Sequence, residues 1–140
     1  MLRQHTWPTE KECSETNMPK QRVLIADDEK LLRSLMTNIL CHDGFETVAV
    51  EDGLQALQVL EDSPDFSLVI SDIQMPRMDG MSLLQNMRQF YPNIPVLITS
   101  VHTSISTMEA ILQQGAVYLP RPFTARQLID AAHQAINSSP

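Results

Sequence analysis

Short apolar runs alternate with longer amphipathic stretches along almost the whole chain, and this alternation constrains the fold more than any other feature. Three runs, at 22–26, 66–71 and 95–99, are nearly continuous and rich in branched residues, as strands are when both faces of their sheet are covered. Two weaker runs, at 46–50 and 116–119, complete a set of five. The pattern predicts five strands, each followed by a helix.

The stretches between the runs have the period of helices that bury one face. Asp52 can cap the second helix, Gly44 and Gly115 can close the first and fourth, and Thr124 and Gln127 form a capping box before the last. The expected apolar faces are Leu32, Leu35, Met36, Ile39 and Leu40; Leu54, Leu57 and Leu60; Leu83, Leu84 and Met87; Ile105, Met108, Ile111 and Leu112; and Leu128, Ile129, Ala132 and Ile136. Strands that alternate with helices predict an α/β fold, in which a doubly wound parallel sheet carries helices on both faces.

The 140 residues suffice for one domain of ordinary size. Residues 1–20 have no apolar period, so we expect a disordered polar tail there. The folded domain is expected at 21–137, and residues 138–140 would form a short tail or the start of a linker.

Composition and charge exclude several classes of protein. A net charge of −7 argues against direct binding of nucleic acid. No run approaches the roughly 20 apolar residues of a membrane helix, and the N-terminus lacks a secretory signal, so we expect a cytoplasmic protein that does not bind a membrane. Cys13 and Cys41 lack the spacing of a metal or redox motif, and we expect two free thiols.

Polar residues stand where the predicted strands end. Asp27 and Asp28 follow the first strand, Asp72 follows the third, Ser100 ends the fourth, and Arg121 comes just after the fifth. Ligands of doubly wound sheets bind beyond the carboxyl ends of the strands. The sequence therefore predicts a site in which an acidic cluster faces a hydroxyl group and a cation.

Three carboxylates drawn together repel one another unless a cation or a proton is shared. Oxygen ligands without His or Cys favour Mg²⁺. Magnesium beside carboxylates can prepare a phosphoryl group for attack, and Asp72, on a central strand, is the best candidate nucleophile. In the alternative interpretation, the acids only cap helices or pair with bases. Nucleotide-binding glycine motifs are absent from the sequence, so an enzyme acting on nucleotides is poorly supported.

Four segments together resemble the receiver domain of bacterial two-component response regulators, as in the chemotaxis regulator. They are Asp27-Asp28, Asp72-Ile-Gln-Met-Pro-Arg-Met-Asp-Gly80, Ser100, and Arg121-Pro-Phe-Thr124. The resemblance covers about residues 21–137. It implies a flavodoxin-like three-layer (βα)5 sandwich with sheet order 2-1-3-4-5, for which a member of this family is a standard example.

The resemblance also implies the roles of the site residues. Asp72 would be the phosphoacceptor. Asp27, Asp28, Asp72 and the backbone carbonyl of Gln74 would be the protein ligands of Mg²⁺. Ser100 would bond to a phosphoryl oxygen and draw its loop inward.

Tyr118 would be the aromatic switch residue that follows this movement, an ordinary packed strand tyrosine being the alternative. The implied partners are a histidine kinase or a histidine phosphotransfer protein, and a downstream protein bound through the face of the fourth helix, fifth strand and fifth helix. Such a domain phosphorylates and dephosphorylates itself without being a turnover enzyme.

Arg121 departs from the family pattern, because it stands where the family carries lysine. Arginine is longer, planar and bidentate, whereas lysine delivers a compact charge. The substitution motivates a second hypothesis, in which the chain is a degenerate receiver that acts only as a protein-interaction module.

Overall fold

The computed structural model describes residues 20–101 and 103–138. The tail expected at 1–20 lies outside the described residues apart from Lys20, and so do the last two residues of the terminal segment expected at 138–140. Within the described part, strands and helices alternate without exception, as the apolar runs predict.

The centre of the molecule is a five-stranded sheet with the order β2-β1-β3-β4-β5. Its strands are β1 (Arg22–Ala26), β2 (Glu46–Val50), β3 (Leu68–Asp72), β4 (Val96–Ser100) and β5 (Val117–Pro120). All four strand pairs are parallel. The predicted doubly wound α/β fold and its sheet order are confirmed.

Three strands differ from the prediction in their boundaries. β3 begins at Leu68 rather than at Phe66, because the N–H of Phe66 donates to the carbonyl of Pro64 in a turn and is not in the sheet. Phe66 is nevertheless buried, which explains why its hydrophobicity resembles that of a strand residue. β4 and β5 are each shifted by one residue toward the C-terminus.

Five helices connect the strands: α2 (Lys30–His42), α3 (Gly53–Asp62), α4 (Gly80–Phe90), α5 (Ile105–Gln113) and α6 (Ala125–Asn137). The predicted end signals are present. Asp52 accepts a hydrogen bond from the N–H of Gln55, and Thr124 and Gln127 form the capping box of α6. Left-handed glycines follow α2 and α5.

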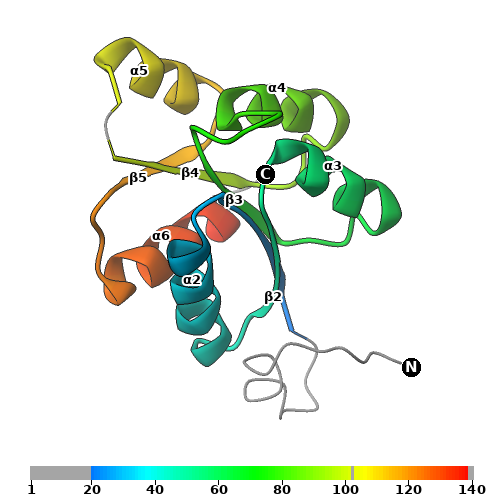
Figure 1. The fold of residues 1–140 in the computed structure, drawn as a ribbon, viewed down its shortest axis with the longest axis vertical. Helices are drawn as coiled ribbons and strands as arrows, with labels where there is room; N and C mark the ends of the chain where they lie inside the picture. Colours follow the sequence, from blue (N-terminus) through cyan, green and yellow to red (C-terminus); the bar gives the residue numbers. More distant parts are fainter. Residues whose placement is uncertain (1–19, 102, 139–140) are drawn as a thin grey trace.

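The helices cover both faces of the sheet, with α2 and α6 on one face and α3, α4 and α5 on the other (Figure 1). Successive strand residues point to opposite faces. Accordingly, Leu24 belongs to the core under α3, α4 and α5, while Val23 and Ile25 belong to the core under α2 and α6. Both faces of the sheet are therefore shielded from water, and polar side chains can reach water at the ends of its strands.

The helical faces are narrower than the sequence pattern suggests. Leu35, Leu54, Ile105 and Leu112 are expected to be buried but are 50%, 42%, 74% and 54% exposed. A helix that packs on a sheet buries only a stripe, so apolar residues at the margin of the stripe remain in water. These leucines and the isoleucine contribute to the surface and not to the core.

The expectation of free thiols is wrong at Cys41, which is buried and disulfide-bonded. Sequence spacing says nothing of the distance between two thiols, and that distance decides whether they can be joined. Cys13 lies outside the described residues. In the described part of the chain, every helix is too short or too polar to traverse a bilayer.

Candidate functional site

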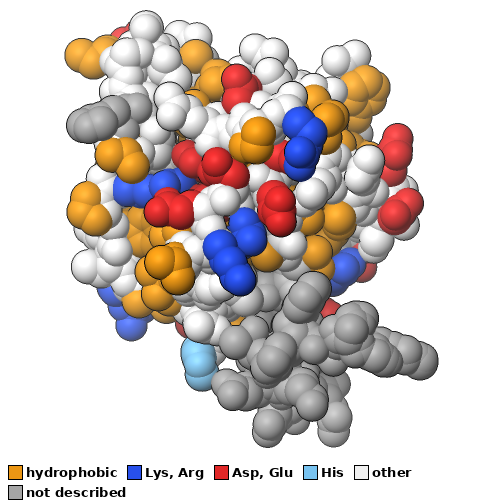
Figure 2. Space-filling model, in the orientation of Figure 1, with side chains coloured by type: hydrophobic (Ala, Val, Ile, Leu, Met, Phe, Trp, Pro, Cys, Tyr) orange, Lys and Arg blue, Asp and Glu red, His pale blue; other side chains and the backbone are white. Residues whose placement is uncertain are grey.

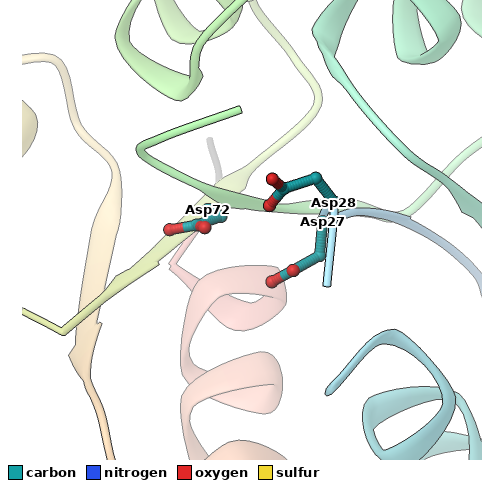
Figure 3. Close-up of side chains that lie close together, drawn as sticks. All are labelled: Asp27, Asp28 and Asp72. Atoms are coloured by element: carbon teal, nitrogen blue, oxygen red, sulfur yellow. The ribbon is translucent and has the colours of Figure 1, made fainter. Parts of the chain in front are cut away.

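Three carboxylates meet at the carboxyl edge of the sheet. Asp27 and Asp28 follow β1, and Asp72 is the last residue of β3 (Figure 3). β1 and β3 are hydrogen-bonded neighbours, with Ala26 paired to Ser71, so the residues that follow them emerge side by side. One carboxylate oxygen from each acid lies within 4.8 Å of the others. The acidic cluster predicted from the sequence is therefore present.

The three acids differ in their exposure to water. Asp27 is fully buried, Asp72 is half-buried and Asp28 is exposed. Asp27 accepts a hydrogen bond from the N–H of Glu29 at 2.8 Å. The cluster reaches from the protein interior to the surface, and Figure 2 shows acidic side chains gathered near the middle of the visible face with Lys or Arg side chains around them.

Burial destabilises the ionised forms of two of these acids. It raises the pKa of Asp27 to about 6, against the lowering effects of the Glu29 N–H and of Arg121. Burial also raises the pKa of Asp72, while Arg121 and the backbone N–H groups of Ile73 and Gln74 act in the opposite direction. Both carboxylates would therefore gain from an additional cation.

Arg121 is the cation that the structure places between them. Its Nη2 lies 2.9 Å from Asp27 Oδ2 and 3.1 Å from Asp72 Oδ1. Its Nε and Nη2 donate to Thr99 Oγ1 at 3.3 and 3.1 Å, and Nη1 lies 3.7 Å from Glu29 Oε1. With its side chain 11% exposed, the guanidinium is an integral part of the site.

Sequence reasoning missed Thr99 and Glu29 as partners of Arg121. Thr99 had a signal, because it is a polar residue at the end of an apolar strand and pairs in register with Asp72. Glu29 is one of many acids in the sequence, and no sequence signal distinguishes it from the others. The direction of the Arg121 side chain depends on the backbone of the segment after β5, where Arg121 N–H donates to Ser100 O at 3.0 Å.

The remaining predicted residues lie around the acids. Ser100 is buried at the end of β4, at the same edge of the sheet. Gln74 is exposed, in the loop that follows Asp72. Tyr118, on β5, donates from its hydroxyl group to Thr103 Oγ1 at 2.9 Å. The predicted switch tyrosine is therefore tied to the loop between β4 and α5, through a threonine that the sequence pattern did not indicate.

The residues present fit a divalent cation with oxygen ligands. The cluster offers carboxylates only, one of them exposed, and no His or Cys belongs to it. This donor set suits Mg²⁺, which keeps several waters and takes few protein ligands.

A groove opens beside the acids. It has a volume of about 450 Å³, and its walls come from the start of α2 and from the segment after β5. The lining residues are Glu29, Leu31, Leu32, Leu35, Val101, Arg121, Pro122 and Phe123. Apart from Glu29 and Arg121, the lining residues are apolar.

The fold and the site together define a flavodoxin-like α/β domain with an acidic edge at the carboxyl ends of its central strands. The chain belongs to the response regulator receiver domain family, whose model matches residues 23–133. The resemblance identified from the sequence motifs is thereby confirmed.

Individual relatives agree with the family. The response regulator protein FleR of Pseudomonas aeruginosa is 41% identical over 121 residues, which are 85% of this chain and 25% of FleR. The solved receiver domain of NtrX from Brucella abortus is 34% identical, with a TM-score of 0.78 over 84% of this chain and 99% of that one. A CheY-like receiver domain from Methanospirillum hungatei has a TM-score of 0.80 at 24% identity, over 85% and 95% of the two chains, and supports the fold alone. The chain spans about a quarter of the length of the curated relatives it matches first.

Proposed function

We propose that this receiver domain accepts a phosphoryl group on Asp72 with the help of Mg²⁺, and that the modification changes its affinity for a partner protein. The observation that carries the proposal is the convergence of Asp27, Asp28 and Asp72 within 4.8 Å at the carboxyl edge of the sheet. Buried carboxylates are costly unless a cation compensates them, so a stable arrangement of this kind favours a function that uses the cation.

In this proposal Asp72 is the nucleophile. One of its carboxylate oxygens forms a bond to phosphorus while the bond from phosphorus to the donor nitrogen or oxygen breaks, and the donor leaves with the electron pair. Asp27, Asp28, Asp72 and the Gln74 carbonyl would hold Mg²⁺, which supplies charge compensation for the phosphoryl oxygens. Arg121 and the Ser100 hydroxyl would bind those oxygens.

The signal would leave the site through β4 and β5. A hydrogen bond from Ser100 to the phosphoryl group would draw the β4–α5 loop inward, and Tyr118 holds that loop through Thr103. The partner surface would be the face of α5, β5 and α6, where Ile105 and Leu112 are exposed. A switch of this kind needs only a few kcal/mol of difference between two states.

The phosphodonor would be a histidine kinase or a histidine phosphotransfer protein, and the domain would act in the cytoplasm without binding nucleic acid or membrane itself. The apolar groove between α2 and Phe123 is lined in part by Arg121, which contacts Asp27 and Asp72. This position suits the approach of a protein donor that carries its phosphoryl group on a side chain. Phosphorylation and hydrolysis would both occur on this domain, so it is a signalling domain and not a turnover enzyme.

A second candidate function is that of a degenerate receiver, an interaction module without phosphorylation. The contact that favours it is the guanidinium of Arg121, which already bridges Asp27 and Asp72 and is almost buried. Retention of all three acids and of Ser100 favours phosphorylation instead.

Incubation with acetyl phosphate, with and without Mg²⁺, followed by intact mass measurement, tests the proposal. We expect a single phosphate adduct that requires Mg²⁺. The adduct should disappear in Asp72→Asn and persist in Asp62→Asn, a matched change of an exposed acid at the end of α3. Absence of any adduct in the unmodified sequence, together with no spectral response to beryllofluoride, would select the degenerate receiver.

A further inference from the structure

The loop between β3 and α4, residues 73–79, carries the backbone groups that surround Asp72. The backbone N–H groups of Ile73 and Gln74 act on the Asp72 carboxylate and lower its pKa, against the raising effect of burial. At the far end of the loop, Gly80 N–H donates to Ile73 O at 2.7 Å, and a Cβ on Gly80 would collide with the Asp72 carbonyl oxygen. The position of this loop therefore sets the position of the phosphoacceptor and of the Gln74 carbonyl.

A backbone contact joins this loop to the start of α3. Gly53 N–H donates to Met78 O at 3.1 Å. A Cβ on Gly53 would lie 2.7 Å from Met78 Cγ, closer than side-chain carbons approach, so only glycine permits this contact. The end of the loop and the first turn of α3 are thus packed directly against each other.

An ion pair joins the same two segments. Arg77, in the loop, pairs through Nη2 with Oδ2 of Asp52, whose side chain is fully buried. Asp52 Oδ1 caps α3 through Gln55 N–H. Within the described part of the chain, the Arg77 guanidinium is the only group that compensates Asp52 Oδ2, which has no other hydrogen-bonding partner there. An uncompensated buried carboxylate would be costly, so Arg77 is needed to stabilise the charge of Asp52.

The backbone conformation of Arg77 is one that arginine seldom adopts. Its φ is 65°, in the left-handed region, and Arg77 is the one residue other than glycine with positive φ in the described chain. A left-handed residue directly after a proline is usually Gly or Asn, as in type II turns. A long cationic side chain is disfavoured in this conformation, and the contact with Asp52 accounts for its presence.

We propose that Asp52 and Arg77 are positioning residues of the acidic site, whose ion pair latches the 73–79 loop to α3 and thereby orients the Asp72 carboxylate and the Gln74 carbonyl toward a divalent cation. The inference deepens the proposed function and rests on it for the identity of the cation. Both residues act through the backbone of the loop, in the way that groups outside the ligand set tune metal sites.

Three substitutions separate the ion pair from other effects. Arg77→Gly removes the side chain and suits the left-handed backbone. Asp52→Asn retains an oxygen that caps α3 but removes the charge. Arg77→Lys keeps a cation and should restore part of the function. The matched control is Arg126→Ala, which removes another exposed arginine from an ion pair, with Asp130 at 3.6 Å.

The measurements are the Mg²⁺ dissociation constant from titration calorimetry, amide hydrogen exchange at single residues, and thermal stability. In Arg77→Gly and Asp52→Asn, we expect exchange at the Gly53 and Gly80 amides to become about tenfold faster. The affinity for Mg²⁺ should fall by about three- to tenfold. Arg77→Lys should give intermediate values, and Arg126→Ala should match the unmodified sequence.

Each possible result bears on the latch. Unchanged exchange at Gly53 and Gly80 in both variants would overturn it. A lower thermal stability with unchanged affinity for Mg²⁺ would show that the pair is merely structural, and would overturn the positioning role. If the unmodified sequence binds no Mg²⁺, the proposed function fails, and exchange at the Gly53 and Gly80 amides then decides by itself whether the ion pair holds the loop against α3.

Discussion

At the scale of single residues, Arg121 determines the charge balance of the acidic site. Its guanidinium contacts Asp27 and Asp72 at 2.9 and 3.1 Å, through oxygens that a divalent cation would also need. Arginine donates in a planar fork that can bridge two carboxylates, whereas lysine carries a compact charge on a flexible stem. A bound cation and the guanidinium therefore compete for the same oxygens, and the residue type at position 121 sets the outcome.

Replacing Arg121 with lysine is therefore expected to tighten the binding of Mg²⁺. Because lysine cannot bridge both acids as arginine does, we expect an affinity about fivefold higher, equivalent to about 1 kcal/mol. Titration calorimetry of Arg121→Lys against the unmodified sequence measures the change, with Arg126→Lys as the control at an exposed position. An equal or weaker affinity in Arg121→Lys would show that arginine does not compete with the ion.

Asp27 makes the stability of the fold depend on pH. Its pKa is about 6 in the folded protein, raised from 3.8 mainly by burial. Between these two values the folded state binds the proton more tightly than the unfolded state, so the stabilising contribution of protonated Asp27 is complete below pH 3.8 and is lost as the pH rises through 6. Above pH 6 the buried charge should cost roughly 3 kcal/mol.

Asp27→Asn should accordingly be more stable than the unmodified sequence at pH 7.5, by roughly 3 kcal/mol, and the difference should vanish near pH 4. Urea unfolding over this pH range measures it, and Asp62→Asn controls for the loss of an exposed acid. A difference that is the same at all pH values would mean that Asp27 does not titrate as its burial implies.

The composition of the site could be predicted from the sequence, but its contacts could not. Strand ends are recognisable, so the meeting of Asp27, Asp28 and Asp72 follows from the topology of a parallel sheet. The orientation of Arg121 depends on which of several acids lies within reach of a long side chain. That choice is made by three-dimensional distances of a few ångströms, which no spacing along the chain encodes.

At the scale of elements, the β4–α5 loop connects the acidic site to the proposed partner face. It follows Ser100, and Tyr118 holds it by donating to Thr103 Oγ1 at 2.9 Å. The apolar residues of β5 predict the strand. They do not predict which residue accepts the hydrogen bond of the Tyr118 hydroxyl group, because several polar residues of the loop could accept it.

Tyr118→Phe removes this hydrogen bond and keeps the ring. We expect a loss of about 1 kcal/mol in stability, and faster amide hydrogen exchange in the β4–α5 loop and the first turn of α5. Exchange in α2, which lies on the other face of the sheet (Figure 1), should stay the same and serves as the internal control. Unchanged exchange in the loop would show that Tyr118 does not restrain it.

The apolar groove between α2 and the segment after β5 is expected to be the docking surface for a protein phosphodonor. Leu31 lines the groove and is 82% exposed, so Leu31→Glu should leave the fold intact. We expect transfer from a histidine phosphotransfer protein that labels the unmodified sequence to slow by about tenfold. Labelling by acetyl phosphate should not change, because this small donor does not need the groove.

A matched control for that experiment is Leu112→Glu, which alters another exposed leucine, on α5. It should leave both kinds of labelling unchanged. If Leu31→Glu slows acetyl phosphate as well, the substitution disturbs the acids and says nothing of a protein surface. Equal transfer rates for both leucine variants would exclude the groove as the docking surface.

At the scale of the whole molecule, the same sheet forms the core of the fold and brings the acids of the site together. The alternating apolar runs predict the sheet, its parallel strands and its two helical layers, because each strand must be covered on both faces. The same topology brings the acids together at one edge, where their charges oppose folding. Arg121 compensates the buried acids only in part. The sum of many buried apolar side chains offsets the remaining cost, and a bound divalent cation would lower it.

Mg²⁺ should therefore stabilise the whole fold. An ion that binds only the folded state stabilises it by about 1.4 kcal/mol at tenfold excess over its dissociation constant, which corresponds to a rise of roughly 5 °C in the midpoint of thermal unfolding for a domain of this size. Calorimetric scans at pH 7.5 with MgCl₂, and with NaCl at equal ionic strength, separate binding from screening. The double variant Asp27→Asn, Asp72→Asn removes two of the three carboxylates and should lose the effect of Mg²⁺. An equal rise with NaCl, or in the double variant, would show that the acidic edge is not the site at which the ion acts.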